Sequence, residues 1–171
     1  MEIVMKKARN LTKTIFIIYC GILIWTVLFK MAASPEELRY LTGIRKLNLI
    51  PFDYRGGIPR ILIRETAMNV LVFIPFGFYL KMLGVSGGKA VFRGFLLSFA
   101  FEACQYLLAI GISDMTDLLT NTLGTAIGVG LYLLIREIWP DKETIARRIN
   151  RLAVAALLLF GALLTLLILA N

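Results

Sequence analysis

Long apolar stretches separated by short polar connections dominate the pattern of this chain. Five of them are long enough to cross about 30 Å of hydrocarbon, which takes roughly 20 residues of α-helix. We expect these spans at residues 14–33, 67–85, 90–110, 118–135 and 152–170. The pattern therefore predicts an all-α, polytopic membrane bundle of about five transmembrane helices, formed as a single domain over residues 1–171.

The connection at residues 34–66 departs from this pattern. Ser34 followed by Pro35 is typical of a helix start, and Gly43 is typical of a helix end. Beyond Gly43, apolar residues are interrupted by Pro51 and Pro59. Such a segment is neither a soluble loop nor a span, so we expect it to lie in the outer interface or to re-enter the bundle.

Polar residues interrupt the third and fourth spans. Glu102 and Gln105 lie near the middle of the third span, where an ionisable group costs roughly 2.5–3.5 kcal/mol and usually marks a functional site. Their spacing of three places them on one face of a helix. Asp114, Asp117 and Asn121 also share one face if the fourth helix begins near Asp114.

Asn69 extends this cluster from the second span, at a spacing of four from Glu65. All three polar faces can converge on a pocket that opens to the outer side. Gly124 and Gly128, four residues apart, favour close packing of the fourth span against a neighbouring helix.

Composition supports the membrane class. Hydrophobic residues make up 58% of the chain and mean hydropathy is +0.78, against about 45–50% apolar usage in soluble domains. The net charge of +8 is explained by basic residues that flank spans and meet anionic lipid, so we expect no nucleic-acid partner. The chain contains no histidine, which excludes Ser-His-Asp and Cys-His catalysis.

The basic residues also predict orientation. Twelve of the nineteen lysine and arginine residues lie before the first span, around the connection after the second span, and around the connection after the fourth. Since cytoplasmic loops carry an excess of basic residues, we expect a cytoplasmic N-terminus and an outer C-terminus.

The polar cluster allows several kinds of chemistry. The three carboxyl groups of Glu102, Asp114 and Asp117 are candidate catalytic groups, because burial disfavours the charged form and suits a general acid or base. The same three groups could instead hold a hard cation such as Mg²⁺; no other cofactor is expected. Arg64 could bind a lipid phosphate in a bidentate manner. The alternative is a purely structural interhelical network, worth about 0.6 kcal/mol per hydrogen bond.

Four fragments, in order, resemble the VanZ-like membrane protein family over about residues 48–128. They are Asn48-Leu49-Ile50-Pro51-Phe52, then Asn69 followed by Phe73-Ile74-Pro75-Phe76-Gly77, then Glu102-x-x-Gln105, and finally Asp114-x-x-Asp117-x-x-x-Asn121-Thr122-Leu123-Gly124. The resemblance implies a bacterial cell membrane protein. The founding member of this family is associated with low-level resistance to the lipoglycopeptide teicoplanin, so the resemblance implies a phenotype, and a mechanism must be argued from the residues.

Two functions remain open. In the first, an outward polar pocket acts on or binds an amphipathic ligand, such as a membrane lipid, a lipid-linked cell-wall precursor or a lipoglycopeptide. The candidate ligand-binding residues are Asn48, Arg64, Asn69, Gln105 and Asn121. In the second, the protein is a non-catalytic structural or partner-binding membrane protein whose polar cluster only fixes helix packing.

Overall fold

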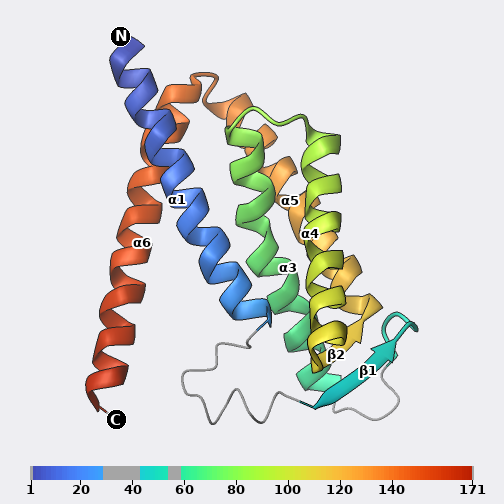
Figure 1. The fold of residues 1–171 in the computed structure, drawn as a ribbon. Helices are drawn as coiled ribbons and strands as arrows, with labels where there is room; N and C mark the ends of the chain where they lie inside the picture. The colour runs from blue at the N-terminus through green and yellow to red at the C-terminus, as the bar shows by residue number, and fades with distance from the viewer. Residues whose placement is uncertain (1, 29–42, 54–58, 171) are drawn as a thin grey trace.

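Helices form most of the computed structural model, which describes residues 2–28, 43–53 and 59–170 (Figure 1). Within these residues, 5 helices are long and apolar enough to cross a membrane, which confirms the predicted all-α bundle of five spans. They are α1 (Glu2–Leu28), α3 (Pro59–Met82), α4 (Gly87–Leu108), α5 (Met115–Ile138) and α6 (Lys142–Ala170).

Helices α1 and α6 begin well before the spans that hydropathy predicted. Hydropathy marks the apolar part of a helix, whereas lysine, arginine and glutamate are good helix formers that extend it into the polar region. The N-terminus of α6 is also capped: Asp141 accepts hydrogen bonds from the backbone N–H groups of Glu143 at 3.1 Å and Thr144 at 3.0 Å. These bonds and one from the Thr144 hydroxyl, which is the largest contribution, hold the pKa of Asp141 below its usual range.

Helices α3 and α5 run in the same direction and pack with their backbones in close contact. A Cβ atom on Gly128 would lie 2.0 Å from the carbonyl oxygen of Ile74, and one on Gly124 would lie 2.3 Å from that of Val70. Only glycine fits at this separation. The expected role of this glycine pair in helix packing is confirmed.

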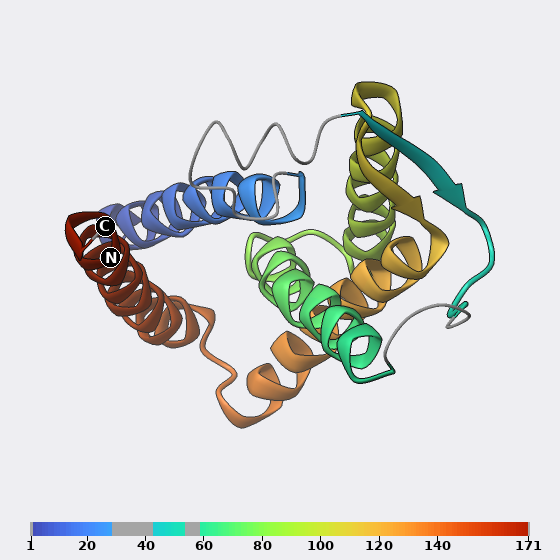
Figure 2. The ribbon, with the colours of Figure 1, turned by 90° about the horizontal axis from the view of Figure 1, so that it is seen from below.

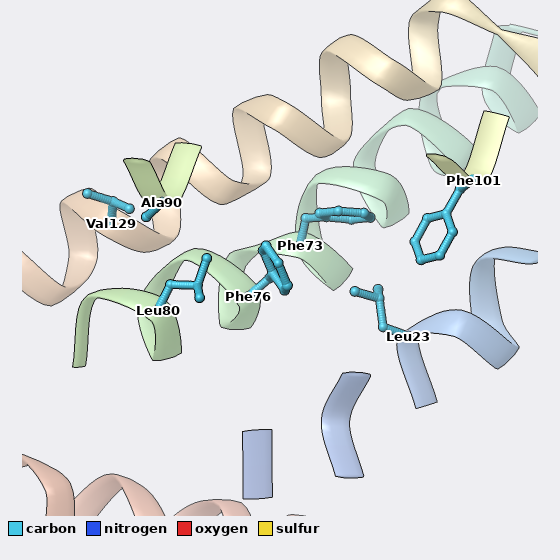
Figure 3. Close-up of a cluster of buried hydrophobic side chains, with 7 residues drawn as sticks. All are labelled: Leu23, Phe73, Phe76, Leu80, Ala90, Phe101 and Val129. Atoms are coloured by element: carbon cyan, nitrogen blue, oxygen red, sulfur yellow. The ribbon is translucent and has the colours of Figure 1, made fainter. Parts of the chain in front are cut away.

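An apolar core fills the centre of the bundle between α1, α3, α4 and α5 (Figure 3). Phe73 is fully buried at 0% exposure, and its ring meets that of Phe101 edge-on with centroids 6.3 Å apart. Asn69 precedes Phe73 by one helical turn, and Glu102 follows Phe101 directly. The aromatic pair therefore lies next to these polar residues, on the side that faces the centre of the bundle.

A two-stranded parallel sheet, which the sequence did not predict, crosses one end of the bundle (Figures 1 and 2). It pairs β1 (Ile44–Asn48) with β2 (Ile110–Asp114), and Asn48 lies opposite Asp114. The third span, expected to reach residue 110, ends at Leu108 because Ala109 adopts a left-handed conformation with φ of 54°. The chain can then leave the helix and extend as β2.

Within the segment at residues 34–66, residues 43–53 lie at the end of the bundle and do not run between the helices (Figure 2), whereas residues 59–66 form the first turns of α3. Apolar side chains of residues 43–53 are exposed, among them Leu47, Leu49 and Ile50, as in a segment that lies in the membrane interface. The helix expected after Ser34 falls on residues 34–42, outside the described residues.

Candidate functional site

The predicted polar residues gather at one end of the bundle, where α1 and α4 end, α3 and α5 begin, and the small sheet crosses (Figure 1). This end lies opposite the end at which α1 begins. Because α3 and α5 both start here, their first turns bring unpaired backbone N–H groups and polar side chains to the same place.

Asp114 connects the sheet to α5. It is the N-cap of α5, and its Oδ1 accepts a hydrogen bond of 2.7 Å from the backbone N–H of Thr116. Its Oδ2 accepts a bond of 3.0 Å from the side-chain amide of Asn48 on β1. The Oδ1 atom of Asn48 in turn accepts the backbone N–H of Ile50 at 3.2 Å. Asn48 and Asp114 thus fix the strand pair against the helix.

Glu102 holds the same junction from α4. Its side chain is only 6% exposed, and Oε2 accepts the backbone N–H of Asp114 at 2.7 Å. The second oxygen, Oε1, has no hydrogen-bond partner among the described residues. Gln105, one turn further along α4, donates from Nε2 to the carbonyl oxygen of Val27 at 3.1 Å and so satisfies a carbonyl in the last turn of α1.

Two further amides join helices. The side chain of Asn69 on α3 donates to Oδ1 of Asp117 on α5 at 2.6 Å. Asn121, only 1% exposed, donates to the hydroxyl oxygen of Ser98 on α4 at 3.0 Å. Asn121 is enclosed in the helix packing, whereas Asn69 and Asp117 are half-buried and border open space.

A cavity of about 330 Å³ opens beside this network, between α1, α3, α4 and α5. We name it the headgroup cavity. The described residues of its wall are Thr26, Val27, Arg64, Glu65, Met68, Asn69, Val72, Gln105 and Asp117. These residues combine one guanidinium group, two carboxyl groups and two amides with an apolar side formed by Val27, Met68 and Val72. The Oε1 atom of Gln105 is buried and has no hydrogen-bond partner among the described residues.

A smaller pocket of about 40 Å³ lies next to it and shares Glu65 and Asp117 with it. Asp114 and Thr116 also line this pocket, and the Thr116 hydroxyl oxygen accepts the backbone N–H of Phe52 at 3.0 Å. Phe52 has a φ of 56°, an uncommon value for a residue other than glycine.

The structure therefore divides the predicted site residues into two groups. Arg64, Asn69, Gln105 and Asp117 line the headgroup cavity. Asn48, Glu102, Asp114 and Asn121 do not line it; the hydrogen bonds described above join these residues to neighbouring strands and helices. The sequence predicted a pocket lined by Glu102, Asp114 and Asn121. The headgroup cavity is lined instead by Asn69, Gln105 and Asp117 of the same cluster.

Sequence reasoning missed Thr26, Val27, Met68 and Val72, which carry no polar signal that distinguishes them from ordinary span residues. Glu65, by contrast, precedes Asn69 by four residues and so shares a helix face with it. That spacing was the feature of the sequence from which Glu65 could be assigned to the cavity wall.

The three carboxyl groups considered as Mg²⁺ ligands are not gathered into one site. Those of Glu102 and Asp114 accept backbone N–H groups, and Asp117 accepts the amide of Asn69. Within the described part of the chain, no group of three or more acidic, histidine or cysteine side chains is placed to hold a metal ion. The magnesium hypothesis gains no support from this arrangement and stays a prediction.

Comparison with known proteins decides the family. The model of the VanZ/LLP1 family matches residues 16–136, which include the whole polar cluster and end before α6. The chain belongs to the VanZ/LLP1 family. It is 35% identical over 137 residues to "Protein VanZ" of Enterococcus faecium, an alignment that covers 79% of this chain and 81% of that protein. No solved structure matches the chain significantly. The resemblance predicted from the four fragments is confirmed.

Proposed function

We propose that this VanZ/LLP1 protein binds the polar head of an amphipathic, lipid-linked ligand in the headgroup cavity, and that this binding lowers susceptibility to lipoglycopeptides such as teicoplanin. The observation that carries the proposal is the composition of the cavity wall, which is charged and amide-rich on one side and apolar on the other. A ligand with a charged head and a hydrocarbon tail satisfies both sides.

Arg64 supplies the positive charge of the cavity. A guanidinium group binds a phosphate through two parallel hydrogen bonds, which suits a lipid-linked phosphate. The Oε1 atom of Gln105 accepts a hydrogen bond from a sugar hydroxyl or amide of the head, since it has no partner among the described residues. Asp117 and Glu65 can accept further hydroxyl groups. Binding through these groups requires no covalent step.

In the proposed orientation, this cavity lies at the extracellular surface of the cell membrane. The chain termini lie at opposite ends of the bundle (Figure 1), and the cavity lies at the end where α1 finishes. With the N-terminus in the cytoplasm, as the basic residues predict, the cavity faces the side on which lipid-linked cell-wall precursors and lipoglycopeptides meet.

A structural role for part of the cluster has its own support. The pairs Asn121–Ser98 and Glu102–Asp114 join helices or a helix and a strand, and neither pair lies in the cavity wall. In this second candidate function, the whole cluster fixes the bundle and the protein acts as a non-catalytic membrane partner.

The test measures binding of purified full-length protein to vesicles of phosphatidylcholine that contain polyprenyl phosphate. We expect R64Q to lower the apparent affinity about tenfold or more, because a hydrogen bond to a charged group contributes about 1.5–3 kcal/mol. M68W, which fills the cavity without changing charge, should have the same effect. K46Q is the matched control, since Lys46 is an exposed basic residue of β1 at the same end of the bundle.

Teicoplanin tolerance of cells that express each variant provides the second measurement. R64Q and M68W should lose tolerance, and K46Q should retain it. Unchanged binding and unchanged tolerance in both cavity variants would overturn the proposal and favour the structural role.

A further inference from the structure

A second cavity lies at the other end of the protein, between α1 and α6. These two helices meet near their N-terminal ends and separate further down (Figure 1). Their contact includes Asn150, which is 1% exposed and donates to the hydroxyl oxygen of Thr12 at 2.9 Å. Along most of its length α6 exposes apolar side chains, and only 6% of the residues in its most apolar stretch are buried.

The cavity, which we name the α1–α6 groove, has a volume of about 450 Å³. The described residues of its wall are Lys7, Ala8, Leu11, Arg147, Asn150, Arg151, Val154, Ala155 and Leu158. Three of these residues are basic, and no acidic side chain of the described residues lines the groove. The groove therefore has a positive charge that a negatively charged ligand would neutralise.

Charge and apolar surface are separated along the groove. The basic residues Arg147 and Arg151 lie nearer the start of α6, and Val154 and Leu158 follow them towards the membrane centre. At 1.5 Å per residue, the distance along the helix from Arg147 to Leu158 is about 16 Å. A ligand that fits this length has an anionic head beside the basic residues and a hydrocarbon chain alongside the apolar ones.

Asn150 gives a further indication of a ligand. It lines the groove, and its Oδ1 atom is buried without a hydrogen-bond partner among the described residues. A buried acceptor without a hydrogen-bond partner is energetically unfavourable. A hydroxyl group of a ligand head would supply the missing donor. Basic side chains beside a hydroxyl acceptor match a head that carries both a phosphodiester and free hydroxyl groups.

We infer that the α1–α6 groove is a binding site for an anionic glycerophospholipid of the phosphatidylglycerol type. The phosphodiester lies against the three basic side chains, a headgroup hydroxyl donates to Asn150, and one acyl chain lies along the apolar wall. The bound lipid fills the space between two helices that otherwise share only a short contact. This site lies at the opposite end of the bundle from the headgroup cavity and does not depend on the proposed function.

The experiment is native mass spectrometry of the full-length protein, released from detergent after titration with phosphatidylglycerol or phosphatidylcholine of the same acyl chains. We expect retention of phosphatidylglycerol with an apparent affinity about tenfold higher than that of phosphatidylcholine, because each nearby basic residue favours anionic lipid. The double variant R147Q/R151Q should lose this preference. The control K89Q/K142Q, which removes two exposed basic residues from the same end of the bundle, should keep it.

A third variant tests the acyl chain. A155F narrows the apolar part of the groove without changing charge, and it should weaken retention of both lipids. Soluble glycerophosphoglycerol, which has the head without the chains, should fail to displace the bound lipid at equal concentration.

Three results would overturn the inference. The first is an equal preference for phosphatidylglycerol in R147Q/R151Q and in the native chain. The second is displacement by glycerophosphoglycerol at equal concentration, which would indicate a site for a free phosphate. The third is a lipid-free dimer that R147Q/R151Q or A155F converts to a monomer, which would indicate that a second copy of the chain occupies the groove.

Discussion

The side-chain amide of Asn69 on α3 donates a hydrogen bond of 2.6 Å to Oδ1 of Asp117 on α5. Both residues line the headgroup cavity, and Val70, the next residue of α3, touches the backbone of α5 at Gly124. The close glycine packing of the two helices therefore determines the distance between the two polar side chains. Helix packing and cavity shape are linked at this point.

Asn69→Leu should lower stability through this link. The change removes the amide that donates to the half-buried carboxyl group of Asp117. Loss of this hydrogen bond should lower the free energy of unfolding by about 1–3 kcal/mol. Thermal melting of the purified protein in detergent measures the effect. Asn10→Leu, at an exposed position of α1, is the control and should melt like the native chain. Equal melting temperatures for both variants would show that the Asn69–Asp117 bond does not stabilise the bundle.

Gly128→Ala should damage the α3–α5 contact more severely. The added Cβ would lie 2.0 Å from the carbonyl oxygen of Ile74, so the helices must separate. Such overpacking costs about 1–3 kcal/mol or more. Gly130→Ala, two residues along the same helix, is the matched control because its Cβ meets no atom within 4 Å. We expect reduced melting temperature and reduced ligand binding for Gly128→Ala, with no loss of either for Gly130→Ala. If both alanine variants melt alike, the two backbones are not in contact.

Much of this arrangement could be predicted from the sequence, because membrane insertion restricts it strongly. The cost of burying Glu102 and Gln105 in hydrocarbon marked the polar cluster on α4, and the spacing of Asp114, Asp117 and Asn121 indicated that these three residues share one face. Helical periodicity then placed their side chains on common faces. These signals are local, so a single sequence contains them.

The sheet and the cavity wall could not be predicted in this way. β2 (Ile110–Asp114) looks like a continuation of the apolar third span, and its pairing with β1 depends on residues about 66 positions away. The left-handed turn at Ala109 carries no glycine that would indicate it. Val27 enters the cavity wall only because α1 ends beside α4, which is a tertiary relationship. Long-range contacts of apolar residues leave no periodic trace in the sequence.

Glu102 shows how a correct location can still leave a role open. The sequence placed it in the cluster, and the structure places its Oε2 atom 2.7 Å from the backbone N–H of Asp114. We expect Glu102→Gln to retain this acceptor, so its free energy of unfolding should lie within about 1 kcal/mol of that of the native chain. Glu102→Ala should lower the free energy of unfolding by about 1–3 kcal/mol. Chemical denaturation in detergent measures both. A stable Glu102→Gln protein that has lost teicoplanin tolerance would instead assign a chemical role to the carboxyl group.

The orientation of the bundle leads to the last prediction. Lys142 begins α6 at the end of the bundle where α1 also begins, and α6 then runs the full length of the bundle to the other end (Figure 1). With the N-terminus in the cytoplasm, a reporter fused after Lys142 should be cytoplasmic, and one fused after Asn171 should lie outside. Alkaline phosphatase, which is active only outside, and a fluorescent protein that folds in the cytoplasm give complementary readings. If both fusions report the same side, α6 does not cross the membrane. If the two readings are exchanged, the headgroup cavity faces the cytoplasm and cannot meet an extracellular lipoglycopeptide.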